Sequence, residues 1–314
     1  MSAAEPLAPS DATEKGGRHR SGPSPTLGWT GLWFAAPGLL LLAAFLAVPF
    51  FAAIGLSFSS ERLASPLPTR FVGFENYLTT LGSSSFHRAF VNNVWFTAIV
   101  VPVQTALALG LAMLVNQRLT GIKIYRAIYF APIVVVMTVA ATVWLLLFSP
   151  ERGLLNTILG LVSFGMVQSE WLQSTTMALP SIMIMSIWQG VGFQMIIILA
   201  GLQDIPGDLY EAASIDGASS WQRFAFITLP QLRNTLIFVV TVTMILAFRL
   251  FDQVWVMTRG GPLSSTNVMM LELVQVGFEE QRIGRASSIA VIFFLIVLSL
   301  TLLQRRFLRE GDAS

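Results

Sequence analysis

Cysteine is absent from the 314 residues of this chain, and other residues that usually carry chemistry are scarce. Without cysteine there are no disulfides, no thiol catalysis and no iron–sulfur ligation. The two histidines, His19 and His87, lie far apart in the sequence, which argues against a histidine-based metal site. A G-x-x-x-x-G-K-[ST] phosphate-binding loop is also missing, since Lys15 and Lys123 lie in other contexts. We therefore expect no catalytic residue, no metal and no cofactor in this chain.

Charge is scarce as well, at 11% of residues against about 25% in ordinary globular domains. Hydrophobic residues make up 54%, and the mean hydropathy is +0.69. Apolar windows of the roughly 20 residues that cross a bilayer recur along the chain. Only the fifth contains ionisable residues, Arg249 and Asp252. The windows predict six spans, at about 32–58, 91–115, 127–148, 177–202, 235–253 and 286–303.

These windows favour helices because they lack the alternating pattern of a transmembrane strand. We expect an all-α polytopic membrane protein. Six spans place both termini on one side, and basic residues in the tails and in the short second loop indicate the cytoplasm. Arginines also lie on the opposite side, so this bias is moderate. The basic residues used are Lys15, Arg18, Arg20, Arg118, Lys123, Arg126, Arg305, Arg306 and Arg309.

The predicted organisation is a flexible cytoplasmic tail at 1–28, a transmembrane domain at 29–304 and a cytoplasmic tail at 305–314. The first apolar stretch is too long for the core of a cleaved signal, so we do not interpret it as one. A net charge of +2 indicates no role in nucleic-acid binding.

A polar loop at 204–230 separates the fourth and fifth spans. Pro206 and the acidic residues after it favour a short helix to about Ile215. Gly217 supplies a turn, because glycine enters left-handed conformations without penalty, and Ser219 or Ser220 can cap a second helix. Two short helices joined at a glycine form a rigid knob. From local chemistry alone, a knob that meets a partner and a structured loop without one are both open.

The loop sequence, EAASIDGASSWQRFAFITLP from Glu211 to Pro230, resembles the EAA loop of permease subunits of binding-protein-dependent ATP-binding cassette (ABC) importers. The chain is most similar to the carbohydrate-uptake group typified by maltose permease. Further segments agree with landmarks of that group, so the resemblance covers nearly everything after about residue 30. They are Phe71–Tyr77, Arg126–Pro132, Gly153–Asn156 and Arg259–Pro262.

The resemblance implies a type I importer fold in the bacterial inner membrane and a heterodimeric pore shared with a second EAA-type permease. It also implies two cytoplasmic subunits that bind ATP and Mg, and an extracytoplasmic binding protein that delivers a di- or oligosaccharide. This chain would then be no enzyme, and its loop would receive force from the ATPases. The coupling residues implied are Glu211, Ala212, Ala213, Asp216, Gly217, Ile227, Leu229 and Pro230.

In the family the substrate pocket lies near mid-membrane, so polar residues of the fourth and fifth spans are its candidates. For each serine or threonine, back-bonding to its own helix is the competing interpretation. Arg249 could pair with Asp252 three residues on, or could contact an anionic substrate. The predicted pathway residues are Ser186, Gln189, Gly190, Phe193, Thr243 and Arg249.

Two alternatives stay open at this stage. The cargo could be a polyol phosphate such as a glycerol phosphate rather than a neutral sugar. The chain could also be a six-span secondary transporter or channel. Against the second stands the lack of any carboxylate within a span core, which ion coupling usually requires.

Overall fold

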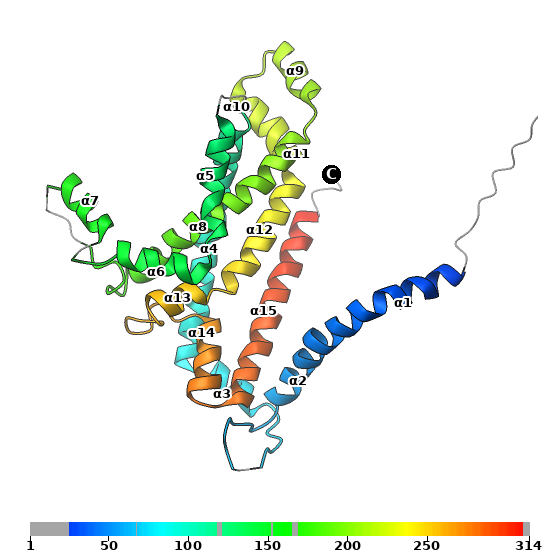
Figure 1. Cartoon of the computed structure of the whole chain (residues 1–314), viewed down its shortest axis with the longest axis vertical. Coiled ribbons are helices and arrows are strands. Elements are labelled where there is room, and N and C mark those ends of the chain that lie inside the picture. The colour runs from blue at the N-terminus through cyan, green and yellow to red at the C-terminus, as the bar shows by residue number, and fades with distance from the viewer. Residues whose placement is uncertain (1–24, 67, 118–120, 152, 165–168, 310–314) are drawn as a thin grey trace, which may run out of the picture. The chain divides into compact units, whose positions relative to one another are not determined.

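The computed structural model describes residues 25–66, 68–117, 121–151, 153–164 and 169–309 (Figure 1). Most of the predicted N-terminal tail, the last five residues and two of the arginines used for orientation, Arg118 and Arg152, lie outside these ranges. Within them the chain is helical, and the only extended pairing is an isolated bridge between Ser59 and Phe71. The expected all-α membrane fold is confirmed.

The helices follow one another along the chain with short connections. They are α1 (Pro25–Leu42), α2 (Val48–Ser57), α3 (Glu75–Leu81), α4 (Ser84–Val115), α5 (Ile122–Val134), α6 (Met137–Leu147), α7 (Leu154–Val162), α8 (Ala178–Gln203), α9 (Gly207–Ile215), α10 (Ser220–Arg223), α11 (Leu229–Gln231), α12 (Arg233–Phe248), α13 (Asp252–Met257), α14 (Met269–Val274) and α15 (Ile283–Arg309). Single π-helical turns lie at Ala43–Ala47, Phe224–Thr228 and Gln275–Glu279.

The chain divides into two compact units, Met1–Ala52 and Ala53–Ser314. In the described part, five helical runs are long and apolar enough to cross a membrane, and a bent pair of helices makes a sixth. These agree with the six predicted windows to within a few residues at most ends. The largest difference is at α4, which begins at Ser84, seven residues before the predicted window.

The third predicted span, 127–148, is not a single straight helix. It consists of α5 and α6, which are bent by 99° at the break between Val134 and Met137. Pro132 has no N–H to continue the hydrogen-bond ladder, and the β-branched residues that follow it adopt extended backbone angles at Val135. The carbonyl freed there is not left bare, because Gln189 of α8 donates its Nε2–H to Val135 O at 3.1 Å.

The core of the second unit is built on α4 and α8, which pack along each other in a close helix pair (Figure 1). Small residues of α4, Ala108 and Ala112, meet Met195 and Ile198 of α8 without exposed surface. Gly192 brings α8 against the backbone of α5, where any Cβ would collide with Tyr129 O. Small residues at such contacts are the usual way for helices to pack in a membrane.

The fifth span is interrupted between α12 and α13. The carbonyl of Phe248, at the end of α12, accepts a hydrogen bond from Asn93 Nδ2 at 3.1 Å. The same fully buried amide accepts from the backbone N–H of Met269, at the start of α14, at 2.8 Å. One asparagine of α4 therefore holds the broken end of α12 and the first turn of α14 in place.

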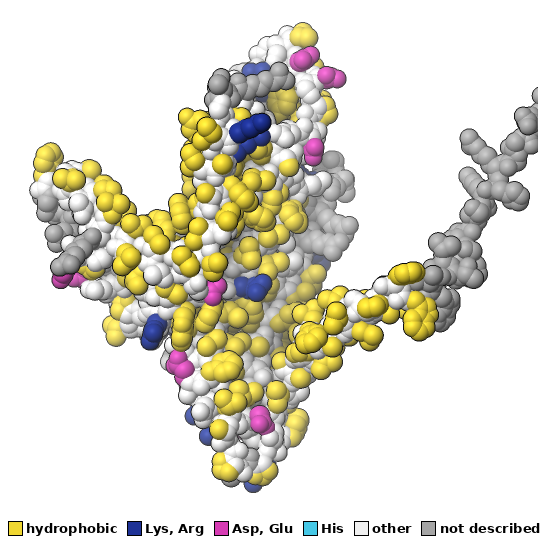
Figure 2. All heavy atoms as spheres, viewed as in Figure 1, with side chains coloured by type: hydrophobic (Ala, Val, Ile, Leu, Met, Phe, Trp, Pro, Cys, Tyr) yellow, Lys and Arg dark blue, Asp and Glu magenta, His cyan; other side chains and the backbone are white. Residues whose placement is uncertain are grey.

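Hydrophobic side chains cover most of the visible face of this helix bundle, as Figure 2 shows, while charged side chains gather mainly at its ends. In the outer loops, backbone groups are satisfied by single asparagines. Asn156 donates to the carbonyls of Pro150 and Ser169 and accepts from Trp171 Nε1 at 2.8 Å. The landmark Gly153–Asn156 is thus the closure of a loop.

Replacing Asn93 with Leu leaves the Phe248 carbonyl and the Met269 N–H unpaired in the core. Each unpaired buried group costs about 1–3 kcal/mol, so the thermal midpoint of the detergent-solubilised protein is expected to fall by several degrees, on the order of 2–4 °C per kcal/mol. Val94→Leu, on the exposed face of the same helix, is the control and should melt as wild type. A wild-type midpoint for Asn93→Leu would contradict this account.

Candidate functional site

The 204–230 loop forms a compact knob at one end of the second unit. Gly217 adopts φ +78°, the left-handed conformation expected from the sequence, and its N–H bonds to Ser214 O at 3.2 Å. Ser219 then caps α10 in a reciprocal box with Gln222. The predicted helix to Ile215 and the predicted cap are both confirmed.

Two side-chain contacts tie the halves of the knob together. Tyr210 of α9 shares a hydrogen bond with Thr228 at 2.9 Å. Arg223 of α10 donates Nη1–H to Ser214 Oγ at 2.8 Å. Because both contacts cross from α9 to the segment after the glycine, the knob is cross-braced and can move as one body.

The surface of the knob is apolar and hollowed. Trp221 and Phe226 are 71% and 77% exposed. A cavity of about 310 Å³ lies beside them, lined by Ala213, Asp216, Gly217, Ala218, Gln222, Arg223, Phe226 and Ile227. Of the predicted coupling residues, Glu211, Ala212, Asp216, Gly217 and Pro230 are exposed, while Ala213, Ile227 and Leu229 are half-buried. Exposed aromatic residues around a hollow are typical of a protein-binding surface.

The knob lies at the same end as the connection between α4 and α5. Leu202 and Leu232, which flank the loop, pack on Ala112 and Val115 at the end of α4. The start of α4 packs instead against α14 and the first part of α15, through contacts of Phe86 with Met269 and Ile289. The two ends of α4 therefore mark two opposite faces of the protein.

A second cavity, of about 550 Å³, lies between these faces. It forms where the two interrupted spans meet: Val135 and Val136 come from the break between α5 and α6, and Arg249 and Asp252 from the break between α12 and α13. The walls between are supplied by α4 and α8. Discontinuous helices that meet at mid-membrane are the usual setting of transport sites.

Five of the six predicted pathway residues line this cavity. They are Ser186, Gln189, Gly190, Thr243 and Arg249. Phe193 lies outside the lining, because the cavity ends on α8 at Gly190, one turn before it. Beyond that level Gln194 of α8 donates to Thr243 of α12 at 2.5 Å and joins the two helices.

Most hydroxyl groups around the cavity bond to their own helices. Ser186 donates to Ile182 O and Thr243 donates to Val239 O, at 2.8 and 2.7 Å. Ser186 also accepts from Gln253 Nε2 at 3.1 Å. Back-bonding, the interpretation that competed with ligand contact, therefore describes both donors in the empty cavity.

The expected pair of Arg249 and Asp252 is not formed. Residues three apart face one way only within one helix, and here α12 ends at Phe248 before α13 begins at Asp252. Both side chains are exposed, and the described residues include no ion-pair partner for either. The cavity thus presents one unpaired positive and one unpaired negative group.

Sequence reasoning missed two amides of the lining, Gln104 on α4 and Gln253 on α13. Gln104 is the clearer omission. It is a long polar side chain within a charge-free apolar window, which is a signal for function in a membrane segment. It was overlooked because the pocket was expected only in spans three to six.

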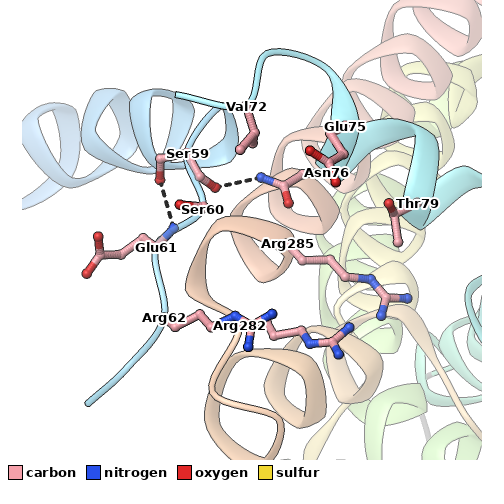
Figure 3. Close-up of a pocket in the computed structure, with 10 residues that line it drawn as sticks. All are labelled: Ser59, Ser60, Glu61, Arg62, Val72, Glu75, Asn76, Thr79, Arg282 and Arg285. Atoms are coloured by element: carbon pink, nitrogen blue, oxygen red, sulfur yellow. Dashed lines mark hydrogen bonds between the residues drawn. The ribbon is translucent and has the colours of Figure 1, made fainter. Parts of the chain in front are cut away.

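A polar pocket of about 230 Å³ lies at the face opposite the knob, between the Ser59–Arg62 segment, α3 and the start of α15 (Figure 3). Asn76 fixes its rim by donating to Ser59 O at 2.8 Å. Arg282 and Arg285 both lie 3.7 Å from Glu280, and Figure 3 shows Glu61 pointing away from them. This face therefore carries arginine groups accessible to a partner.

The cavity makes a prediction that a chain without cysteine is suited to test. The thiol introduced by Ser186→Cys should react with a small charged thiol reagent roughly tenfold faster than the thiol of Phe238→Cys, because thiolate forms only where water reaches it. Phe238 lies on an exposed face of α12 outside the cavity lining. Labelling rates are read by mass spectrometry on the purified protein. Equal rates at the two positions would show that the cavity is not hydrated.

Comparisons with known proteins give a consistent result. The family model described as "Binding-protein-dependent transport system inner membrane component" matches residues 29–310. The probable ABC transporter permease protein YurN of Bacillus subtilis is 33% identical over 280 residues, covering 88% of this chain and 95% of the relative. The trehalose/maltose transport system permease protein MalF of Thermococcus litoralis is 35% identical over 274 residues, covering 87% and 91%.

A solved structure shares the fold. It is the bacterial alginate ABC transporter in complex with an alginate pentasaccharide-bound periplasmic protein. The TM-score is 0.80, with 20% identity, over 92% of this chain and 97% of that chain.

Proposed function

This chain belongs to the family of binding-protein-dependent transport system inner membrane components, and we propose that it forms half of the membrane pathway of an ABC importer that carries a sugar. The observation that carries the proposal is the 550 Å³ cavity at the meeting point of two interrupted spans, with an amide and hydroxyl lining. Family membership argues against the alternative of a secondary transporter or channel. The sugar-related names of the relatives support the cargo class.

The chain would not hydrolyse ATP itself. Two ATPase subunits, which bind ATP and Mg, would dock on the knob at 204–230, and a second EAA-type permease would complete the pore. Exposed Trp221 and Phe226 beside the hollow at Gly217 support a contact that is protein rather than solvent. Closure of the ATPase pair would then push the knob and rock the spans between inward-open and outward-open states.

This arrangement assigns the two faces. The knob and the connection after α4 would lie in the cytoplasm with both chain termini, in keeping with Lys123 and Arg126 at that end. An extracytoplasmic binding protein would meet the opposite face, where Arg282 and Arg285 line the polar pocket. The protein would thus sit in the bacterial inner membrane with its spans in contact with lipid.

A polyol phosphate remains the second candidate cargo. The unpaired guanidinium of Arg249 at the cavity favours it, because a phosphate would find a charged donor there. Asp252 at the same cavity opposes it by repulsion. The two groups together favour a cargo without net charge.

Uptake by the whole complex tests the cargo. Vesicles are loaded with ATP and reconstituted with this chain and its partner subunits, and the binding protein is added outside with maltose, trehalose or glycerol 3-phosphate. We expect uptake and stimulated ATP hydrolysis with a neutral disaccharide and neither with glycerol 3-phosphate. Vesicles without the binding protein are the control. Stimulation by glycerol 3-phosphate alone would replace the sugar with the second candidate.

Gly217 tests the coupling role of the knob. Proline cannot adopt the φ of +78° found there, whereas asparagine tolerates the left-handed region. Gly217→Pro should abolish sugar uptake while the subunit still inserts in the membrane, and Gly217→Asn should retain uptake within about a factor of two, since its strain is below about 1 kcal/mol. Uptake and copurification with the ATPase subunits are measured together. Wild-type uptake by Gly217→Pro would refute the coupling role.

A further inference from the structure

Gln104 lies on α4 with only 6% of its surface exposed, and that surface faces the 550 Å³ cavity. Its side chain makes no hydrogen bond to any residue that the structure describes, although it carries two N–H donors and a carbonyl acceptor. An unpaired amide in an apolar bundle costs about 1–3 kcal/mol. Such a group needs an explanation, because a leucine of similar size would avoid the cost.

Other amides of the cavity are already engaged. Gln189 bonds to the carbonyl of Val135, and Gln253 bonds to Ser186. These two amides hold the walls in shape. Gln104 differs from them because both its donor and acceptor sides are free to meet a molecule in the cavity.

Gly190 of α8 makes the seat for this amide. A Cβ at position 190 would collide with Nε2 of Gln104 and would lie 3.1 Å from its Cδ and 3.2 Å from its Oε1. The end of the Gln104 side chain therefore rests directly on the backbone of α8, at the edge of the cavity. Any side chain at 190 would displace the amide from that position.

We propose that Gln104, seated on Gly190, is the residue that binds a hydroxyl group of the transported sugar, and that the pair selects uncharged, hydroxyl-rich cargo. A hydroxyl both donates and accepts, and so does a carboxamide, which can meet two neighbouring hydroxyls at once. The apolar wall at Val100 and Leu246 suits the C–H faces of a sugar ring. The inference rests on the proposed function and adds to it a specificity-determining residue and its seat.

The first test removes the amide while keeping its bulk. Gln104→Leu is reconstituted with the partner subunits, and the initial rate of uptake is measured for maltose and trehalose at saturating loaded binding protein. Loss of hydrogen bonds worth about 0.5–1.5 kcal/mol should lower the rate roughly 3- to 10-fold. Gln117→Leu, at the exposed end of the same helix, is the matched control and should transport as wild type.

A second test separates sugar binding from packing. Gly190→Ala should lower both uptake and the yield of assembled complex, because its methyl group crowds the amide. The double variant Gly190→Ala with Gln104→Ser removes the collision and should recover the yield but not the uptake. Recovery of uptake in the double variant would show that Gln104 serves packing alone and would overturn the proposal.

The outcomes also distinguish this inference from the proposed function. If the wild-type complex takes up neither sugar, the proposed sugar cargo fails and the inference fails with it. If the wild-type complex transports a sugar and Gln104→Leu transports it equally well, the inference alone is refuted. If Gln104→Leu loses maltose uptake but gains glycerol 3-phosphate uptake, the amide binds cargo and selects against charge, as proposed.

Discussion

Every backbone N–H and C=O within a membrane needs a partner, and this requirement shapes the whole protein. Continuous helices meet it by themselves, but two spans here are interrupted at Val135 and after Phe248. Amides from neighbouring helices supply the missing partners: Gln189 reaches Val135 O and Asn93 reaches Phe248 O. These hydrogen bonds permit both breaks, and the breaks create the cavity. Without the amides the same apolar sequence would favour two straight spans and a closed bundle.

The six spans could be predicted from composition because each is an apolar run of sufficient length, whereas the breaks could not. Residues at the breaks, such as Val135 and Leu250, are as apolar as their neighbours. An interior proline is not a sufficient signal either, since Pro102 lies within an unbroken α4 while Pro132 precedes the 99° bend. The difference depends on a partner far away in the sequence: Gln189 stands 54 residues after Val135. Hydropathy contains no information about such a pairing.

The coupling loop and the cavity show the same division. The conformation of the loop is local, so Gly217 and Ser219 predicted its turn and its cap correctly. The cavity is assembled from four helices, and only the residues whose span was already suspected were found. Gln104 was missed because its meaning depends on Gly190, a residue on another helix that leaves room for its amide. Polar residues in apolar windows indicate that a site exists, but their partners are set by tertiary packing.

The loop and the cavity are also mechanically connected, because the same two helices serve both. On one side of the loop, α8 carries Gly190 and continues to Gln203, only three residues before α9. On the other side, the helical path from Ser220 leads with little interruption into α12, which carries Thr243. The bond from Gln194 to Thr243 ties α8 to α12 between the two regions. A displacement of the cross-braced knob therefore acts on both helices at once, and through them on the Gly190 seat and the α12 break. In the proposed importer this is the shortest path by which a push at the cytoplasmic face would change the shape of the sugar cavity.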